Sequence, residues 1–182
     1  SLYGPTGIGA LYIRDSEKIN TFKEGGSGCK SLSKTQPEVM HDRFEAGTPN
    51  TPGIIGLGAG IDFILDKGME KIHKKEIELL KLLLEGLEDI SAVKIYGKRS
   101  IEERTAVLGF NISDMGANQT AFKLENDYDI QLRSGLHCAP MLHESLGTID
   151  QGMVRASISY FNEKSDIENL IKAVSVIADN KD

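Results

Sequence analysis

The segment that best defines this chain is Arg133-Ser134-Gly135-Leu136-His137-Cys138-Ala139-Pro140. It places a cysteine in a loop bounded by glycine and proline, the two residues that most often interrupt regular structure. Apolar runs lie on both sides, at residues 130–132 and 154–160, and each run predicts a strand. The cysteine loop is therefore expected between two strands.

Helical and strand patterns alternate in the rest of this region. Apolar residues at helical spacing predict helices at 69–87, 117–126 and 166–178. Two further strands are predicted at 93–96 and 106–112. Short strands that interleave with helices indicate an α/β to α+β layer structure and not a helical bundle.

An additional helix is expected upstream. Thr51, followed by Pro52, is a candidate N-cap for an apolar run at residues 54–65. Small residues on this run would let another backbone approach closely, at some cost in helix propensity. These small residues are Gly56, Gly58, Ala59 and Gly60.

The first fifty residues have the pattern expected at the end of a larger domain. Glycines and a proline followed by an apolar run in residues 2–14 predict a turn that leads into a buried strand. No parallel partner for this strand follows, so we expect the chain to be the C-terminal part of a longer protein. Residues 15–50 are polar and aperiodic, and a loop of this length is usually functional.

Composition excludes several classes of function. The 182 residues are 40% hydrophobic and carry a net charge of −6, without the basic cluster of a nucleic-acid surface. No apolar run is long enough to span a membrane. Cys29 and Cys138 lie far apart, which indicates free thiols and a reducing, cytoplasmic compartment.

Cys138 is the main candidate for chemistry. A thiol is nucleophilic as the thiolate, which nearby cations favour. Arg133 and Arg155 flank it in sequence, so the segment is typical of a site that holds an anion, such as a carboxylate, beside a reactive sulfur. The alternative is that Cys138 is a small buried hydrophobe and that both arginines are solvated.

Weaker signals leave alternatives open. Gly47 and Thr48 before a helix could bind a phosphate, or could serve only in helix capping. Neighbouring residues on an extended chain point apart, so adjacency of His137 and Cys138 does not imply a pair. His143 and Cys138 lack the further ligands of a zinc site, and no metal is expected.

Four motifs, in this order and spacing, give the chain a specific resemblance to class V aminotransferases, and in particular to cysteine desulfurases. They are Tyr3-Gly4-Pro5-Thr6-Gly7-Ile8-Gly9-Ala10-Leu11-Tyr12, Arg43-Phe44-Glu45-Ala46-Gly47-Thr48-Pro49-Asn50, residues 133–139 and Arg155-Ala156-Ser157. The resemblance implies a fold type I enzyme that depends on pyridoxal 5′-phosphate. Residues 1–50 would end the cofactor-binding domain, 51–89 would be linker helices, and 90–182 would form the small domain, with a short mixed or antiparallel sheet under helices.

The resemblance also implies roles for single residues. Cys138 matches the cysteine that takes sulfur from L-cysteine as a persulfide, leaving L-alanine, before a sulfur-acceptor protein receives it for uses such as iron–sulfur cluster assembly. Arg155 matches the arginine that binds the substrate carboxylate, and Arg133 matches a second active-site arginine. Thr48, next to Gly47, matches the threonine that reaches the cofactor phosphate of the other subunit in a homodimer.

One departure bears on the activity of this chain. The lysine that binds the cofactor in the family would lie just before Ser1, and no lysine of this sequence takes its place. The chain alone is therefore expected to be inactive. A selenocysteine lyase or another class V enzyme is the nearest alternative, and a sulfur-carrier or binding module without cofactor is an alternative of another class.

Overall fold

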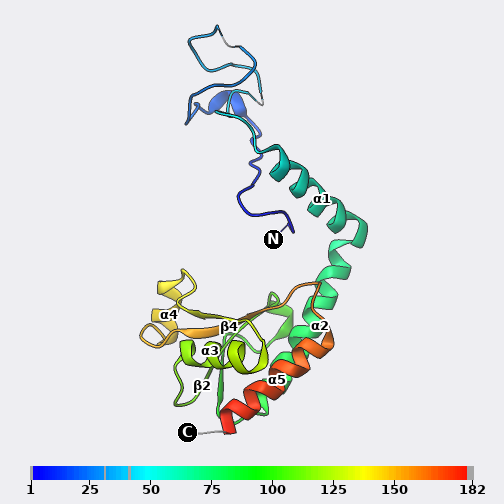
Figure 1. Ribbon diagram of the computed structural model, residues 1–182, viewed down its shortest axis with the longest axis vertical. Coiled ribbons are helices and arrows are strands. Elements are labelled where there is room, and N and C mark those ends of the chain that lie inside the picture. Colours follow the sequence, from blue (N-terminus) through cyan, green and yellow to red (C-terminus); the bar gives the residue numbers. More distant parts are fainter. Residues whose placement is uncertain (1, 31, 41, 180–182) are drawn as a thin grey trace. The chain divides into compact units, whose positions relative to one another are not determined.

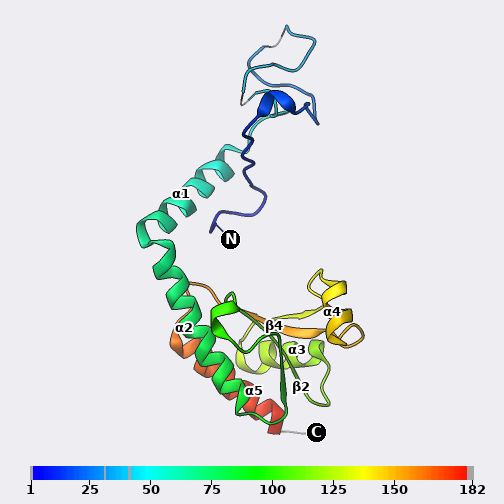
Figure 2. The same ribbon diagram turned by 180° about the vertical axis from the view of Figure 1, so that it is seen from behind.

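The structure is a computed structural model that describes residues 2–30, 32–40 and 42–179. Contacts within the chain divide it into two compact units, residues 1–68 and 69–182. Figures 1 and 2 show the helices and strands of both units from opposite sides. No helix in the described part of the chain is long and apolar enough to cross a membrane.

The main element of the first unit is helix α1, Thr51–Lys67, which confirms the helix predicted there. Its N-cap is Asn50, whose side chain accepts a hydrogen bond from the amide of Gly53 at 3.1 Å. The predicted cap, Thr51, was one residue too late. Asparagine is among the best capping residues, and with Asn50 as cap Pro52 still lies in the first turn.

Two of the predicted small residues of α1, Gly56 and Gly60, allow close packing, whereas Gly58 faces open space. A side chain at Gly60 would collide with the backbone of Leu2 and Tyr3, and one at Gly56 would meet the ring of Pro5 at 2.9 Å. The N-terminal segment therefore lies against the glycine face of the helix. Glycine lowers helix propensity, and this backbone contact explains why it is found here.

The strand predicted in residues 2–14 is not formed. Leu11 and Tyr12 are each 84% exposed, and residues 8–13 have no regular secondary structure. A strand needs a neighbour for its backbone groups, and the described part of the first unit provides none. The expected long loop follows, with a single turn of 3₁₀ helix at Ser16–Lys18.

The second unit is built on a four-stranded sheet in which every pairing is antiparallel. The strand order is β1, β2, β4, β3, with β1 at Val93–Tyr96, β2 at Val107–Ile112, β3 at Arg133–Gly135 and β4 at Met153–Ser157. The predicted α/β to α+β class, with a short sheet under helices, is confirmed.

The third strand was predicted at 130–132, three residues too early. Ile130 and Leu132 pack against the core without pairing, whereas Arg133 and Gly135 pair with Arg155 and Met153 of β4. Apolar character reports burial and not hydrogen bonding between strands. The apolar run at residues 130–132 therefore indicated the buried segment that precedes β3, and not the strand itself.

Helices cover one face of the sheet. Helix α2, Met69–Glu88, and helix α3, Ala117–Tyr128, contact the strands, and helix α5, Lys164–Asp179, packs against both helices (Figure 1). Gly86 of α2 lies directly against the side chain of Ile171, so these two helices approach closely. The fully buried core includes Leu80, Leu83, Leu87, Leu108, Phe110, Leu124, Val154 and Val174.

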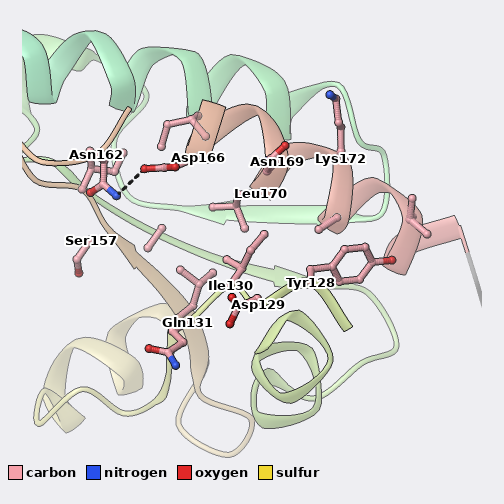
Figure 3. Close-up of a pocket in the computed structure, with 16 residues that line it drawn as sticks. Tyr128, Asp129, Ile130, Gln131, Ser157, Asn162, Asp166, Asn169, Leu170 and Lys172 are labelled. Atoms are coloured by element: carbon pink, nitrogen blue, oxygen red, sulfur yellow. Dashed lines mark hydrogen bonds between the residues drawn. The ribbon is translucent and has the colours of Figure 1, made fainter. Parts of the chain in front are cut away.

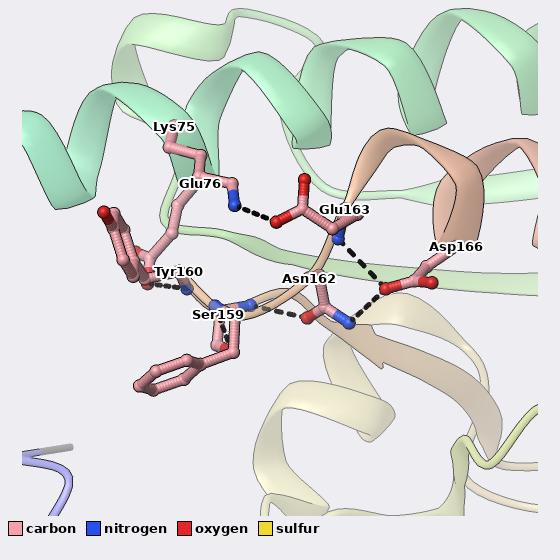
Figure 4. Close-up of polar contacts among 8 residues, drawn as sticks. Lys75, Glu76, Ser159, Tyr160, Asn162, Glu163 and Asp166 are labelled. Atoms are coloured by element: carbon pink, nitrogen blue, oxygen red, sulfur yellow. Dashed lines mark hydrogen bonds and ion pairs between the residues drawn. The ribbon is translucent and has the colours of Figure 1, made fainter.

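The connection from β4 into α5 is fixed by polar contacts (Figure 4). Asp166, in the first turn of α5, accepts hydrogen bonds from the amide of Glu163 at 3.0 Å and from Asn162 at 3.2 Å. These bonds lower the pKa of Asp166, the backbone bond contributing most. Glu76 of α2 accepts from the amide of Tyr160 at 3.1 Å, and Lys75 pairs with Glu163 at 2.7 Å. The β4–α5 connection is therefore tied to α2.

One helix was missed by the sequence pattern. Residues 140–146, which were expected to belong to the cysteine loop, form helix α4, Pro140–Leu146. It begins with proline in its first turn and ends at Gly147 in the left-handed conformation. Seven residues are too few to show an apolar period, and only the local signals of proline and glycine were available.

Phe110→Ala tests the core. Phe110 is fully buried in β2, so the cavity should lower the free energy of unfolding by about 3–5 kcal/mol. Phe122→Ala is the matched control, because this side chain is 67% exposed on α3 and its loss should change stability by less than about 0.5 kcal/mol. Urea titration followed by circular dichroism gives both values, and equal effects of the two changes would contradict the assigned core.

Candidate functional site

One row of residues crosses the sheet on the face opposite to the three covering helices. Tyr96 pairs with Gly109, Gly109 pairs with Arg155, and Arg155 pairs with Arg133. Residues that are directly opposite on paired strands point to the same face. Because Phe110 and Val154 point into the core, their neighbours in this row lie on the other face.

The row brings the two predicted arginines together. Like charges directly opposite each other are unfavourable, so Arg133 beside Arg155 is an arrangement that an anion would relieve. Nε of Arg155 is buried and has no hydrogen-bond partner in the described part of the chain. A carboxylate fits this donor in charge and in geometry.

Cys138 lies at the tip of a tight turn that follows β3 directly. The amide of Ala139 donates to the carbonyl of Leu136 at 2.8 Å, and the two residues between them, His137 and Cys138, have φ angles of 52° and 57°. These are features of a type I′ turn, where glycine and asparagine are preferred. In residues other than glycine, asparagine and aspartate, this backbone conformation costs about 1–2 kcal/mol per residue. The Cys138 thiol is exposed, contrary to the reading of it as a buried hydrophobe.

His137 anchors this turn to the sheet. Its Nε2 lies 3.0 Å from the carbonyl oxygen of Met153 in β4. Burial lowers the pKa of His137, the bond to Met153 raises it, and the charges of Arg155, His143 and Arg133 lower it further. The imidazole points to the sheet while the next side chain, Cys138, is exposed.

The segment that receives His137 is itself pinned by the buried side chain of Asn111. This amide donates to the carbonyl of Gly152 at 2.9 Å and accepts from the amide of Val154 at 3.3 Å. Gly152 has a φ of 68°, and a side chain there would meet the backbone of Gly135 at 2.8 Å. Sequence reasoning missed this support, although a polar residue inside the apolar run 106–112 was a signal for it.

A pocket of about 450 Å³ opens on this face of the sheet. Its lining includes Tyr96, Arg104, His137, Leu142, His143 and Arg155. The pocket combines apolar side chains with guanidinium groups, and its volume suits a small anionic molecule. The structure therefore brings Arg155 to a pocket wall, next to the turn that carries Cys138.

Gly47 and Thr48 belong to the other unit. Gly47 has a φ of 92° and donates its amide to Gly26 at 2.8 Å, while Thr48 is exposed. The cap of α1 is Asn50, so helix capping is not the role of these two residues. An exposed hydroxyl at this turn fits a phosphate oxygen as acceptor.

A second hollow, of about 590 Å³, lies between α5 and residues 128–132 (Figure 3). None of the predicted site residues lines it. Within the described ranges, no three side chains of histidine, cysteine, aspartate or glutamate gather as metal ligands would. The candidate site is therefore the face of the sheet that carries Arg155.

Known proteins resemble this chain over nearly all of its length. The sequence pattern of the family Aminotransferase class-V matches residues 2–170. A cysteine desulfurase of Salmonella agona (strain SL483) is 37% identical over 181 residues, which cover 97% of this chain and 43% of that protein. The chain thus spans less than half of this relative, and the predicted resemblance to cysteine desulfurases is confirmed.

Solved structures agree with this likeness. The apo cysteine desulfurase of Thermococcus onnurineus NA1 has a TM-score of 0.89 and 35% identity, over 97% of this chain and 44% of that one. A cysteine desulfurase of Escherichia coli, solved in an S-sulfonic acid form, has a TM-score of 0.85 and 29% identity, over 98% of this chain and 44% of that one.

The lowered pKa of His137 predicts loss of stability in acid. Because the folded-state pKa lies below the ordinary value of 6.5, the unfolded chain takes up this proton first as the pH falls. The contribution of neutral His137 to stability is complete above pH 6.5 and is lost as the pH falls below that value. His137→Asn, which tolerates the positive φ, should flatten the fall in unfolding free energy between about pH 7 and pH 5. His73→Asn, at an exposed position of α2, is the control; the same flattening there would refute the assignment.

Proposed function

Because the chain belongs to the class V aminotransferase family, we propose that it forms part of a pyridoxal 5′-phosphate-dependent cysteine desulfurase. The complete enzyme would convert L-cysteine to L-alanine and hold the sulfur on Cys138. In this proposal, residues 1–50 end the cofactor-binding domain, 51–89 link the domains, and 90–182 form the small domain. This chain alone would be inactive, because no lysine in it matches the one that binds the cofactor.

The observation that carries the proposal is the exposed thiol of Cys138 on a turn joined to the strand of Arg155. A thiolate at this tip would attack the sulfur of bound L-cysteine, forming an S–S bond as the C–S bond breaks. The β-carbon, which keeps the electron pair of the broken C–S bond, takes up a proton to give L-alanine, and the sulfur remains on Cys138 as a persulfide. Atoms balance without an external oxidant or reductant.

Arg155 would orient the substrate. Its planar guanidinium can bind the α-carboxylate through two parallel hydrogen bonds, and its buried Nε, which has no partner among the residues that the structure describes, supports this role. Arg133, directly opposite on β3, would add positive charge to the same site. A carboxylate held in this way fixes the direction in which the substrate sulfur lies.

Gly47 and Thr48 would hold the phosphate of the cofactor. Thr48 is exposed and its hydroxyl can donate to a phosphate oxygen, while Gly47, whose amide is bonded to Gly26, shapes the turn. When bound, pyridoxal 5′-phosphate supplies an electron sink for the carbon from which sulfur departs. In the proposed homodimer, this phosphate belongs to the partner subunit, so each subunit would complete the other's site.

A sulfur-acceptor protein would then collect the sulfur from Cys138. The exposed position of the thiol supports transfer to another protein. The Escherichia coli relative was solved in an S-sulfonic acid form, and such oxidation selects accessible sulfur with thiolate character. The exposed, free thiols of Cys29 and Cys138 support a reducing compartment, which we propose is the cytoplasm.

Cys138→Ser in the complete enzyme tests the nucleophile. The serine hydroxyl is a much weaker nucleophile, so persulfide formation should disappear while cofactor binding, measured by absorbance, stays normal. Cys29→Ser is the control, since this thiol lies in the other unit, and its persulfide yield should equal that of the unmodified enzyme. Full turnover in Cys138→Ser would exclude the proposed role.

Arg155→Ala in the complete enzyme tests the carboxylate contact and separates the enzyme from a carrier module. Loss of a charge-assisted contact should lower kcat/KM for L-cysteine by roughly ten- to 150-fold. Arg155→Lys should recover only part of this, because a point charge cannot reproduce the planar fork. The exposed Arg99→Ala is the control. Unchanged kinetics in both Arg155 variants would favour a carrier without substrate binding.

A further inference from the structure

The proposed mechanism gives no role to His143, a histidine that lines the candidate pocket. His143 lies in α4 and is completely buried, although histidine is polar and titratable. Its Nδ1 lies 2.9 Å from the hydroxyl of Thr148, which is also buried. Its Nε2 is buried without a partner in the part of the chain that the structure describes. A buried polar atom without a hydrogen-bond partner is rare in native proteins and needs an explanation.

The hydroxyl of Thr148 fixes the orientation of this ring. It lies within reach of both Nδ1 and the carbonyl oxygen of His143, at 2.9 and 3.4 Å. The amide of Thr148 also donates to the same carbonyl at 2.8 Å. A hydroxyl that contacts both a ring nitrogen and the backbone keeps the ring plane in one orientation.

His143 in turn contacts the residue that anchors the cysteine turn. The ring centroids of His143 and His137 are 5.7 Å apart, with the ring planes tilted by 40°. The amide of His143 donates to the carbonyl of Ala139 at 3.2 Å, so the first turn of α4 starts from the last residue of the cysteine turn. A continuous set of contacts thus leads from Thr148 through both histidines to Cys138.

We propose that His143 and Thr148 form a positioning pair that keeps the turn of residues 136–139 closed and so holds the thiol of Cys138 in place. The inference rests on the proposed function only in taking Cys138 as the nucleophile. The turn needs such support, because His137 and Cys138 both adopt a backbone conformation that their side chains disfavour. Neither residue of the pair touches substrate in this proposal.

The direct test follows the turn itself and requires no cofactor. The amide of Ala139, which closes the turn on Leu136, is measured by NMR hydrogen exchange in the 182-residue chain. Thr148→Val keeps the branched shape and removes the hydroxyl, and should speed exchange at Ala139 roughly tenfold or more. Thr148→Ser restores a hydroxyl and should stay within about twofold of the unmodified chain.

The amides of β2 report on the whole unit in the same spectra. They should exchange at unchanged rates in both variants, because the pair is proposed to act on the turn alone. Equal acceleration at Ala139 and in β2 would mean that Thr148 stabilises the fold in general, and would overturn the proposal. Unchanged exchange at Ala139 in Thr148→Val would overturn it as well.

Kinetics of the complete enzyme give the second measurement. Thr148→Val should lower kcat for L-cysteine several-fold and leave KM unchanged, since the carboxylate contact of Arg155 is intact, and Thr148→Ser should recover kcat. Faster exchange at Ala139 with an unchanged kcat would refute the positioning role. This result differs from failure of the proposed function, which is an active Cys138→Ser variant.

Discussion

The register of β4 is the constraint on which both the core and the candidate site depend. Pairing of Phe110 with Val154 places both side chains under the helices, and the alternation of a strand then puts Arg155 on the opposite face, beside Arg133. A slip of one residue would bury Arg155 and expose Val154. The apolar core therefore fixes the position of the charged row, although the two have no side chain in common.

The cysteine turn takes its geometry from the same strand. Asn111 of β2 holds the backbone at Gly152 and Val154, and the carbonyl of Met153 between them faces His137. Buried polar groups are costly when unpaired, so this set of bonds admits few alternative arrangements. The strained backbone at Cys138 is thus held by contacts that reach the centre of the sheet.

Periodicity predicted most of the fold, because burial repeats along helices and strands. It located β1 and the three covering helices, and it failed where burial and pairing separate, as at residues 130–132. Sequence patterns could not show that Arg133 and Arg155 are opposite each other, since register depends on the partner strand. Nor could it reveal the buried contact of His143 with Thr148. The sequence identified Cys138, Arg133 and Arg155 as candidates, whereas their arrangement in space required the three-dimensional structure.

The two faces of the sheet differ in chemistry. The face under the helices is apolar and closely packed, whereas the other face carries Arg133 and Arg155 at directly paired positions, and a strained turn follows β3. The pairing of β3 with β4 places the two arginines at neighbouring positions, and the register that the core sets keeps them there. An anion that binds at this row, as proposed, would find Arg155 already positioned by the sheet, so the fold organises the site before the ligand arrives.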